Sequence, residues 1–156
     1  HCAKTRALYE IQTPLRSTKT YGGTNKKMKE KKDNLVHGEL SYKIIGALYD
    51  VAHELGFSHR EKFYEKAVAK ALTEKGLHFN EQLPVKVHYK KEPVGIYYYD
   101  FLVEEKIVLE LKVKDSFSKK DIDQLFAYLK AQDLKLGIIA HFTKNGVKFK
   151  RIVNLY

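Results

Sequence analysis

The chain has 156 residues, 44% of them apolar and 31% charged, with a formal net charge of +10. This length suits one domain with a single core, and the 12% aromatic content argues against a wholly disordered chain. The apolar stretches, such as the one from Ile44 to Tyr49, are far shorter than the roughly 18 to 20 residues that cross a membrane. The single cysteine, Cys2, cannot form an internal disulfide, so a reducing compartment such as the cytoplasm is expected.

The basic charge is concentrated in the first part of the chain. Residues 1–33 contain nine Lys/Arg and three Asp/Glu and show neither helical nor strand periodicity. We therefore expect a basic, disordered extension over 1–33 and a folded domain over 34–156. The only methionine, Met28, is a candidate natural start of the protein. Because the domain itself is only mildly basic, net charge is a weak argument for polyanion binding.

Two amphipathic helices open the domain. Apolar residues at three- and four-residue steps predict a helix over 39–55, which Gly56 ends. A second apolar stripe predicts a helix over about 59–75, with Gly76 as its left-handed cap.

Three strands are predicted next. After Pro84, apolar residues recur at every second position up to about residue 90, as in a half-buried strand. Two further strands are predicted over 94–103 and 107–113, joined by a charged connection.

The last third of the chain predicts one helix and a hairpin. Ser118 opens the helix, with Asp121 three residues on as an acidic variant of the capping box. Strands over 134–142 and 147–155 then close the chain around an Asn-Gly turn. The order helix, helix, three strands, helix, two strands predicts an α/β fold.

Asp100 needs an explanation, because aspartate is a poor strand former and interrupts a strongly strand-like run. If a three-residue loop pairs Val103 with Ile107, Asp100 lies opposite Glu110. A two-residue loop would put the two carboxylates on opposite faces. The three-residue loop is favoured because it yields one apolar face, made by Tyr97, Tyr99, Phe101 and Val103 against Ile107, Leu109, Leu111 and Val113.

The same register predicts a site for a cation. It places Tyr98 opposite Lys112, on the face of the two acids. Opposed carboxylates repel, and a hard cation such as Mg²⁺ neutralises them with oxygen ligands. Lys112 could then hold an attacking water or a phosphate, so Asp100, Glu110 and Lys112 together suit phosphodiester cleavage. Taken singly, Glu110 and Lys112 could be a solvated salt bridge, and Asp100 could keep an edge strand soluble.

At these residues the chain resembles the GxxExxY proteins, a bacterial branch of the PD-(D/E)XK nuclease-like superfamily. The likeness rests on the run from Asp100 to Lys112, on Glu61 followed by Tyr64, and on Gln124. It covers most of the chain from residue 37 to 155 and implies a restriction-endonuclease-like core around a mixed central sheet. Where the family has a glycine three residues before its helix glutamate, this chain has Ser58.

The resemblance implies a role for each matching residue. Asp100, Glu110 and Glu61 would bind Mg²⁺, with Mn²⁺ as the alternative metal. Lys112 would be the catalytic lysine, and Gln124 would help to position the substrate or a metal-bound water.

Two tyrosines are assigned to substrate binding. Tyr64 matches the tyrosine of the family, and Tyr98 is expected to face the site. Each carried-over residue has an alternative explanation: Glu61 is favoured in a first helical turn by the helix dipole, Tyr64 could pack in the core, and Gln124 could be a surface residue.

Two classes of function fit these residues. The first is a Mg²⁺-dependent nuclease acting on DNA or RNA, as a monomer or a homodimer. The second is a nucleic-acid- or protein-binding module that has the same fold but no catalytic activity.

Overall fold

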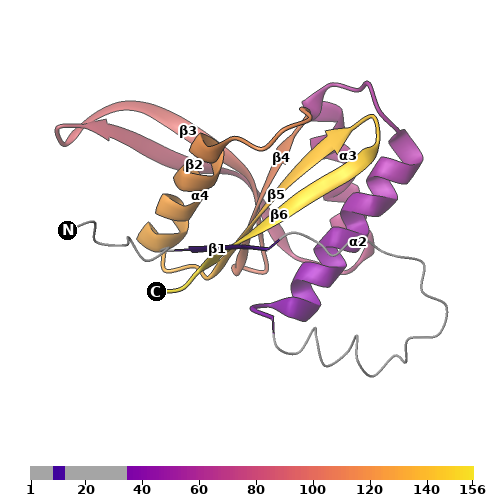
Figure 1. Ribbon diagram of the computed structural model, residues 1–156, viewed down its shortest axis with the longest axis horizontal. Coiled ribbons are helices and arrows are strands. Elements are labelled where there is room, and N and C mark those ends of the chain that lie inside the picture. Colours follow the sequence, from indigo (N-terminus) through magenta and orange to yellow (C-terminus); the bar gives the residue numbers. More distant parts are fainter. Residues whose placement is uncertain (1–8, 13–34) are drawn as a thin grey trace, which may run out of the picture.

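The computed structural model of the chain describes residues 9–12 and 35–156. Its described strands form one six-stranded sheet in the order β1-β6-β5-β4-β3-β2, in which only β4 and β5 run parallel (Figure 1). In chain order the elements are β1 (Tyr9–Gln12), α2 (Gly38–Leu55), α3 (Glu61–Glu74), β2 (Phe79–Tyr89), β3 (Glu92–Val103), β4 (Ile107–Lys112), α4 (Lys119–Ala131), β5 (Leu136–Thr143) and β6 (Gly146–Asn154).

Helices cover both faces of the sheet (Figure 1). The apolar stripes of α2 and α3 pack on one face, in a core that includes Leu48 and Leu109. The stripe of α4 packs on the other face, where Leu125 joins Val108. Gly137 of β5 allows this helix to approach closely, because a Cβ there would lie 2.7 Å from the Leu125 side chain.

The strand β4 lies in the middle of the sheet and is buried on both faces. It pairs antiparallel with β3 and parallel with β5, and α4 makes the connection between the two parallel strands. Ser118 caps α4, as predicted, by accepting the backbone N–H of Asp121 at 3.4 Å. The position of β4 therefore places Glu110 and Lys112 near the centre of the molecule.

The predicted order of elements and the mixed sheet are confirmed over the domain. The largest difference in a boundary is at β2, which begins at Phe79 rather than after Pro84. Its first residues lack strict alternation, but Phe79 pairs with Val103 of β3, so pairing between strands extends β2 beyond its local pattern.

The strand β1 is not predicted by the sequence pattern. Residues 9–12 pair antiparallel with residues 151–154 of β6 and extend the sheet at its edge. A short edge strand of this kind is held by the backbone of its neighbour, which hydropathy patterns do not report. The rest of the predicted extension, including Met28, lies outside the described residues. Among the described helices, none is long and apolar enough to cross a membrane.

Candidate functional site

Asp100 lies where β3 and β4 stop pairing. The ladder begins with Val103 and Ile107, which confirms the predicted three-residue loop, and it ends at its third pair, Phe101 with Leu109. Beyond that point, Oδ2 of Asp100 accepts a hydrogen bond of 2.7 Å from the backbone N–H of Leu111. The buried carboxylate of Asp100 thus replaces a backbone carbonyl at the point where the strands separate.

Two cross-strand pairs expected from this register are not part of the ladder. These are Asp100 with Glu110 and Tyr98 with Lys112. Tyr98 pairs instead with Pro84 of β2. Because the strands separate at Asp100, the two carboxylates interact across a fork in the sheet and not as a regular cross-strand pair.

The prediction that four side chains of β3 share one apolar face is wrong for two of them. Phe101 and Val103 do pack in the core under α2 and α3, but Tyr97 and Tyr99 pack against α4 on the opposite face. The alternation of β3 therefore breaks between Asp100 and Phe101. As a result, the carboxylate of Asp100 points toward α3.

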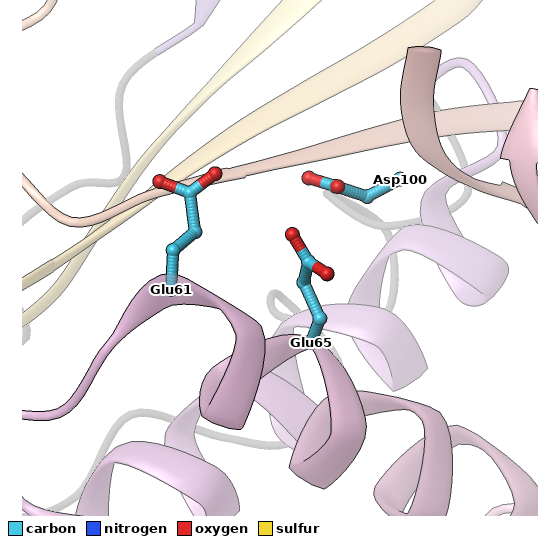
Figure 2. A group of neighbouring side chains, drawn as sticks. All are labelled: Glu61, Glu65 and Asp100. Carbon is cyan, nitrogen blue, oxygen red and sulfur yellow. The ribbon is translucent and has the colours of Figure 1, made fainter.

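Three carboxylates meet at this place. Glu61 and Glu65 come from α3, one helical turn apart, and Asp100 comes from β3 (Figure 2). One oxygen of each lies within 4.8 Å of one oxygen of both others. The two glutamates lie nearer the surface than Asp100, so solvent can reach the cluster past their side chains.

Glu110 and Lys112 form the second part of the site. The Nζ atom of Lys112 lies 3.5 Å from Oε1 of Glu110, in an ion pair that is largely buried. This differs from the alternative of a solvated salt bridge, because Glu110 is only 4% exposed. Its other oxygen, Oε2, is buried and makes no hydrogen bond with any described residue.

Burial makes the two inner carboxylates hard to ionise. It raises the pKa of Asp100 to about 7, although the N–H of Leu111 acts in the opposite direction. It raises the pKa of Glu110 to about 8; the charge of Asp100 adds to this rise, and Lys112 counteracts part of it. A cation bound near Asp100 and Glu110 would therefore strongly stabilise their ionised forms.

Glu61 acts electrostatically on all three residues of the predicted constellation. Its charge contributes to the raised pKa values of Asp100 and Glu110. Burial lowers the pKa of Lys112, but the charges of Glu110 and Glu61 outweigh it and leave the pKa above its usual value. Lys112 is therefore a cation at neutral pH, held among acids.

The donors of this site suit a hard divalent cation. The three clustered groups offer carboxylate oxygens, which Mg²⁺ and Mn²⁺ prefer, and no histidine or cysteine of the described residues joins them. Glu110 alternates with Leu109 and Leu111 of the core under α2 and α3, so its side chain leaves β4 on the face of α4, where its buried Oε2 makes no hydrogen bond with a described residue. Of the predicted metal ligands, Asp100 and Glu61 come together with Glu65, whereas Glu110 lies outside that group of three.

The remaining predicted residues lie in different surroundings. Tyr64 is fully buried, stacks on Phe142 with a centroid distance of 4.2 Å, and donates a hydrogen bond of 2.6 Å to the Gly56 carbonyl. These contacts fit the packing alternative for Tyr64. Tyr98 is 48% exposed on β3, and Gln124 is half-buried on α4.

Sequence reasoning missed Glu65. The signal was present, because Glu61 and Glu65 are four residues apart and lie on one face of the predicted helix. Acids at this spacing are common on exposed helix faces. Only the approach of α3 to Asp100 distinguishes this pair from a solvated one.

Comparison with known proteins identifies a family. The family model of the PD-(D/E)XK nuclease superfamily matches residues 38–152, which is more than half of the chain. The crystal structure of SSO0001 is similar, with 16% sequence identity and a TM-score of 0.45 over 76% of this chain. The chain spans about 60% of the length of that protein. None of the curated proteins compared with the chain matches it.

The chain therefore belongs to the PD-(D/E)XK nuclease superfamily. Its mixed sheet with flanking helices is a restriction-endonuclease-like fold. The acids and the lysine described above lie within the matched residues.

Proposed function

We propose that the protein is a metal-dependent nuclease that hydrolyses phosphodiester bonds of DNA or RNA. The observation that carries this proposal is the buried Asp100 at the β3–β4 fork, facing Glu61 and Glu65 and neighbouring the Glu110–Lys112 pair. Buried carboxylates that repel one another are costly in a fold, and a cation removes that cost.

In this proposal, Asp100, Glu61 and Glu65 hold the cation, which is Mg²⁺ or Mn²⁺. A bound divalent cation polarises a phosphate and lowers the pKa of a coordinated water. Glu110 contributes through Oε1, which holds Lys112, and its raised pKa reflects the nearby charge of Asp100 as well as burial.

Lys112 stabilises the negative charge that builds up on the phosphoryl oxygens. It is suited to this role because it is protonated and its neighbours restrict its position. In the hydrolysis, a water oxygen forms the new bond to phosphorus while the bond to the leaving oxygen breaks. The leaving oxygen takes up a proton, so the products are a phosphate monoester and a free hydroxyl.

Several finer assignments belong to this proposal. Gln124, one helical turn after Asp121 on α4, would orient the substrate or the attacking water. The spacing of Glu61 and Tyr64 supports the GxxExxY branch of the superfamily, although Ser58 replaces its glycine. We also propose a reducing cytoplasmic location, and sedimentation would decide between a monomer and a homodimer.

The test is cleavage of labelled single-stranded and duplex DNA and RNA with Mg²⁺, Mn²⁺ or EDTA. We expect cleavage that needs the metal and falls by at least about 100-fold in Lys112→Ala. Lys119→Ala is the matched control, because Lys119 also pairs with an acid but on the exposed surface of α4, 2.6 Å from Asp123.

Equal loss of cleavage in both lysine variants would mean that Lys112 has no special role. Metal-dependent folding without any cleavage would favour the binding module that has the same fold. Cleavage that persists in EDTA would contradict the proposed metal site.

A further inference from the structure

The β2–β3 hairpin forms an arm that projects beyond α4, away from the rest of the domain (Figure 1). Five of its large hydrophobic side chains are exposed: Val87 42%, Tyr89 63%, Val94 63%, Ile96 55% and Tyr98 48%. No described helix packs over the end of this arm. Exposed apolar side chains gathered on one element indicate a binding surface.

One face of the arm leads directly to the acidic cluster. Tyr97 and Tyr99 pack toward α4, so the alternating residues Ile96 and Tyr98 point to the other face. Asp100 is next in this alternation, and its carboxylate meets those of α3. Ile96 pairs with Lys86 of β2, which adds an exposed cation to the same face.

The arm ends in a basic turn. Lys90 and Lys91 are its two central residues, and both have a left-handed backbone, with φ of 47° and 68°. Two-residue hairpin turns of this type normally use Asn-Gly, because other residues are strained there. The turn thus carries two exposed cations at a conformational cost. At about 3.3 Å per residue, it lies roughly 26 Å along β3 from Asp100.

The opposite end of β3 has the opposite charge. Glu104 and Glu105, also with positive φ, share the turn to β4 with Lys106, so two acids and one base leave this turn with one net negative charge. A polyanion is therefore attracted to the arm end of β3 and repelled from the other end. This polarity is complementary to nucleic acid approaching along the arm.

We propose that the arm binds single-stranded nucleic acid and leads it to the acidic site, an inference that rests on the proposed nuclease function. Tyr98 and Ile96 contact base faces, while Lys86, Lys90 and Lys91 contact phosphates. Aromatic residues interleaved with cations are the usual means of binding a single strand. Paired bases in a duplex do not expose their faces, so this surface selects an unpaired strand.

The test measures binding without cleavage. A fluorescein-labelled oligothymidylate, alone or as a duplex with oligoadenylate, is titrated with the full chain in EDTA, and its anisotropy is followed. We expect the parent to bind the single strand more tightly than the duplex. Because EDTA removes metal-dependent catalysis, the result is independent of whether the site cleaves.

Two arm variants are informative. Lys90→Asn combined with Lys91→Gly creates the preferred turn sequence, so it removes both charges while keeping or raising the melting temperature. Loss of two phosphate contacts is expected to reduce the slope of log affinity against log salt by about 1.4. Tyr98→Ala is expected to weaken binding about tenfold.

The matched control is Lys43→Gln combined with Lys70→Gln, which removes the same charge from exposed positions on α2 and α3. It should leave the affinity unchanged. Equal affinity of the parent and the arm variants, or no binding by the parent, would overturn the proposal. So would a change from dimer to monomer in the arm variants by sedimentation, since it would make the arm a contact between two copies of the chain.

Discussion

The two ends of β3 contain similar residue types, but the side chains are buried at one end and exposed to solvent at the other. At the inner end, Tyr99 and Asp100 are 2% and 5% exposed, and helices cover both faces of the sheet. At the outer end, Val94 and Ile96 are 63% and 55% exposed, and the strand begins there at a basic turn. Aromatic and charged side chains occur in both halves, so burial alone sets them apart.

The contrast between the two ends shows how burial changes what a charge does. The buried acids of the inner end have raised pKa values and require a counter-charge. The exposed lysines of the outer end carry no such cost and can attract phosphates from solution. We interpret the inner end as the place of chemistry and the outer end as the place of substrate capture.

The largest effect is expected from a change in the acidic cluster. Glu65→Gln keeps the shape of the side chain but removes its charge, and we expect cleavage to fall by at least about 100-fold. Glu81→Gln is the control, because Glu81 is an exposed acid of β2. A Glu65→Gln variant that cleaves as fast as the parent would limit the site to Asp100 and its other neighbours.

The next largest effect is on stability: the stabilisation of the folded protein by Mg²⁺ is expected to depend on pH. The folded protein keeps protons on Asp100 and Glu110, with pKa values of about 7 and 8, that the unfolded chain releases near pH 4. Their contribution to stability is therefore complete below about pH 4 and is lost as the pH rises through about 8. Mg²⁺ competes with these protons and should stabilise the protein more at pH 8 than at pH 5.

This coupling can be measured by thermal unfolding with and without Mg²⁺ at both pH values. At a concentration of 100 times Kd, the expected gain at pH 8 is about 2.7 kcal/mol. The Asp100→Asn variant should show little gain at either pH. An equal gain at pH 5 and pH 8 in the parent would show that the cation does not compete with these protons.

A smaller effect separates a buried tyrosine from an exposed one. Tyr64→Phe removes the hydrogen bond to the Gly56 carbonyl and should lower the free energy of unfolding by about 1 kcal/mol, with cleavage unchanged. Tyr98→Phe removes the hydroxyl of an exposed ring and should leave stability unchanged. Denaturant unfolding and the cleavage assay measure both effects. A loss of cleavage at full stability in Tyr64→Phe would contradict a purely structural role and support the predicted role of Tyr64 in binding substrate.

Much of the inner end could be predicted from the sequence. The alternation in β4 and the length of its loop fixed the pairing of Val103 with Ile107, and the spacing of Glu110 and Lys112 placed them on one face. The break in alternation at Asp100 could not be predicted, because it depends on where the two strands separate. That break moved Tyr99 to the opposite face and turned Asp100 toward α3.

The residues that α3 contributes to the site were only partly predictable. Glu61 entered through family resemblance, whereas Glu65 is recognised only when α3 is placed against β3. Tyr64 is buried in the core, which its sequence motif does not report, and its assignment to substrate binding stays a prediction. The strand β1 was missed because a strand held by an edge partner leaves little trace in hydropathy.

The smallest effect is expected from removal of residues 1–27, which deletes β1 from the edge of the sheet. Its few backbone pairs with β6 are offset by the entropy lost in ordering four residues, so the free energy of unfolding should change by less than about 1 kcal/mol. Denaturant unfolding of the full and shortened chains measures this difference. A loss of several kcal/mol would make β1 an essential part of the fold.

The proposed chemistry requires that carboxylates of α3 and β3 together bind a divalent cation. Calorimetric titration of Mn²⁺ into the parent and into Glu65→Gln, with Asp123→Asn as a control on the exposed face of α4, measures this binding without any substrate. We predict that the parent and the control bind one cation with the same affinity and that Glu65→Gln binds it at least tenfold more weakly. Equal affinity in all three proteins, or no binding by the parent, would contradict the proposed metal site.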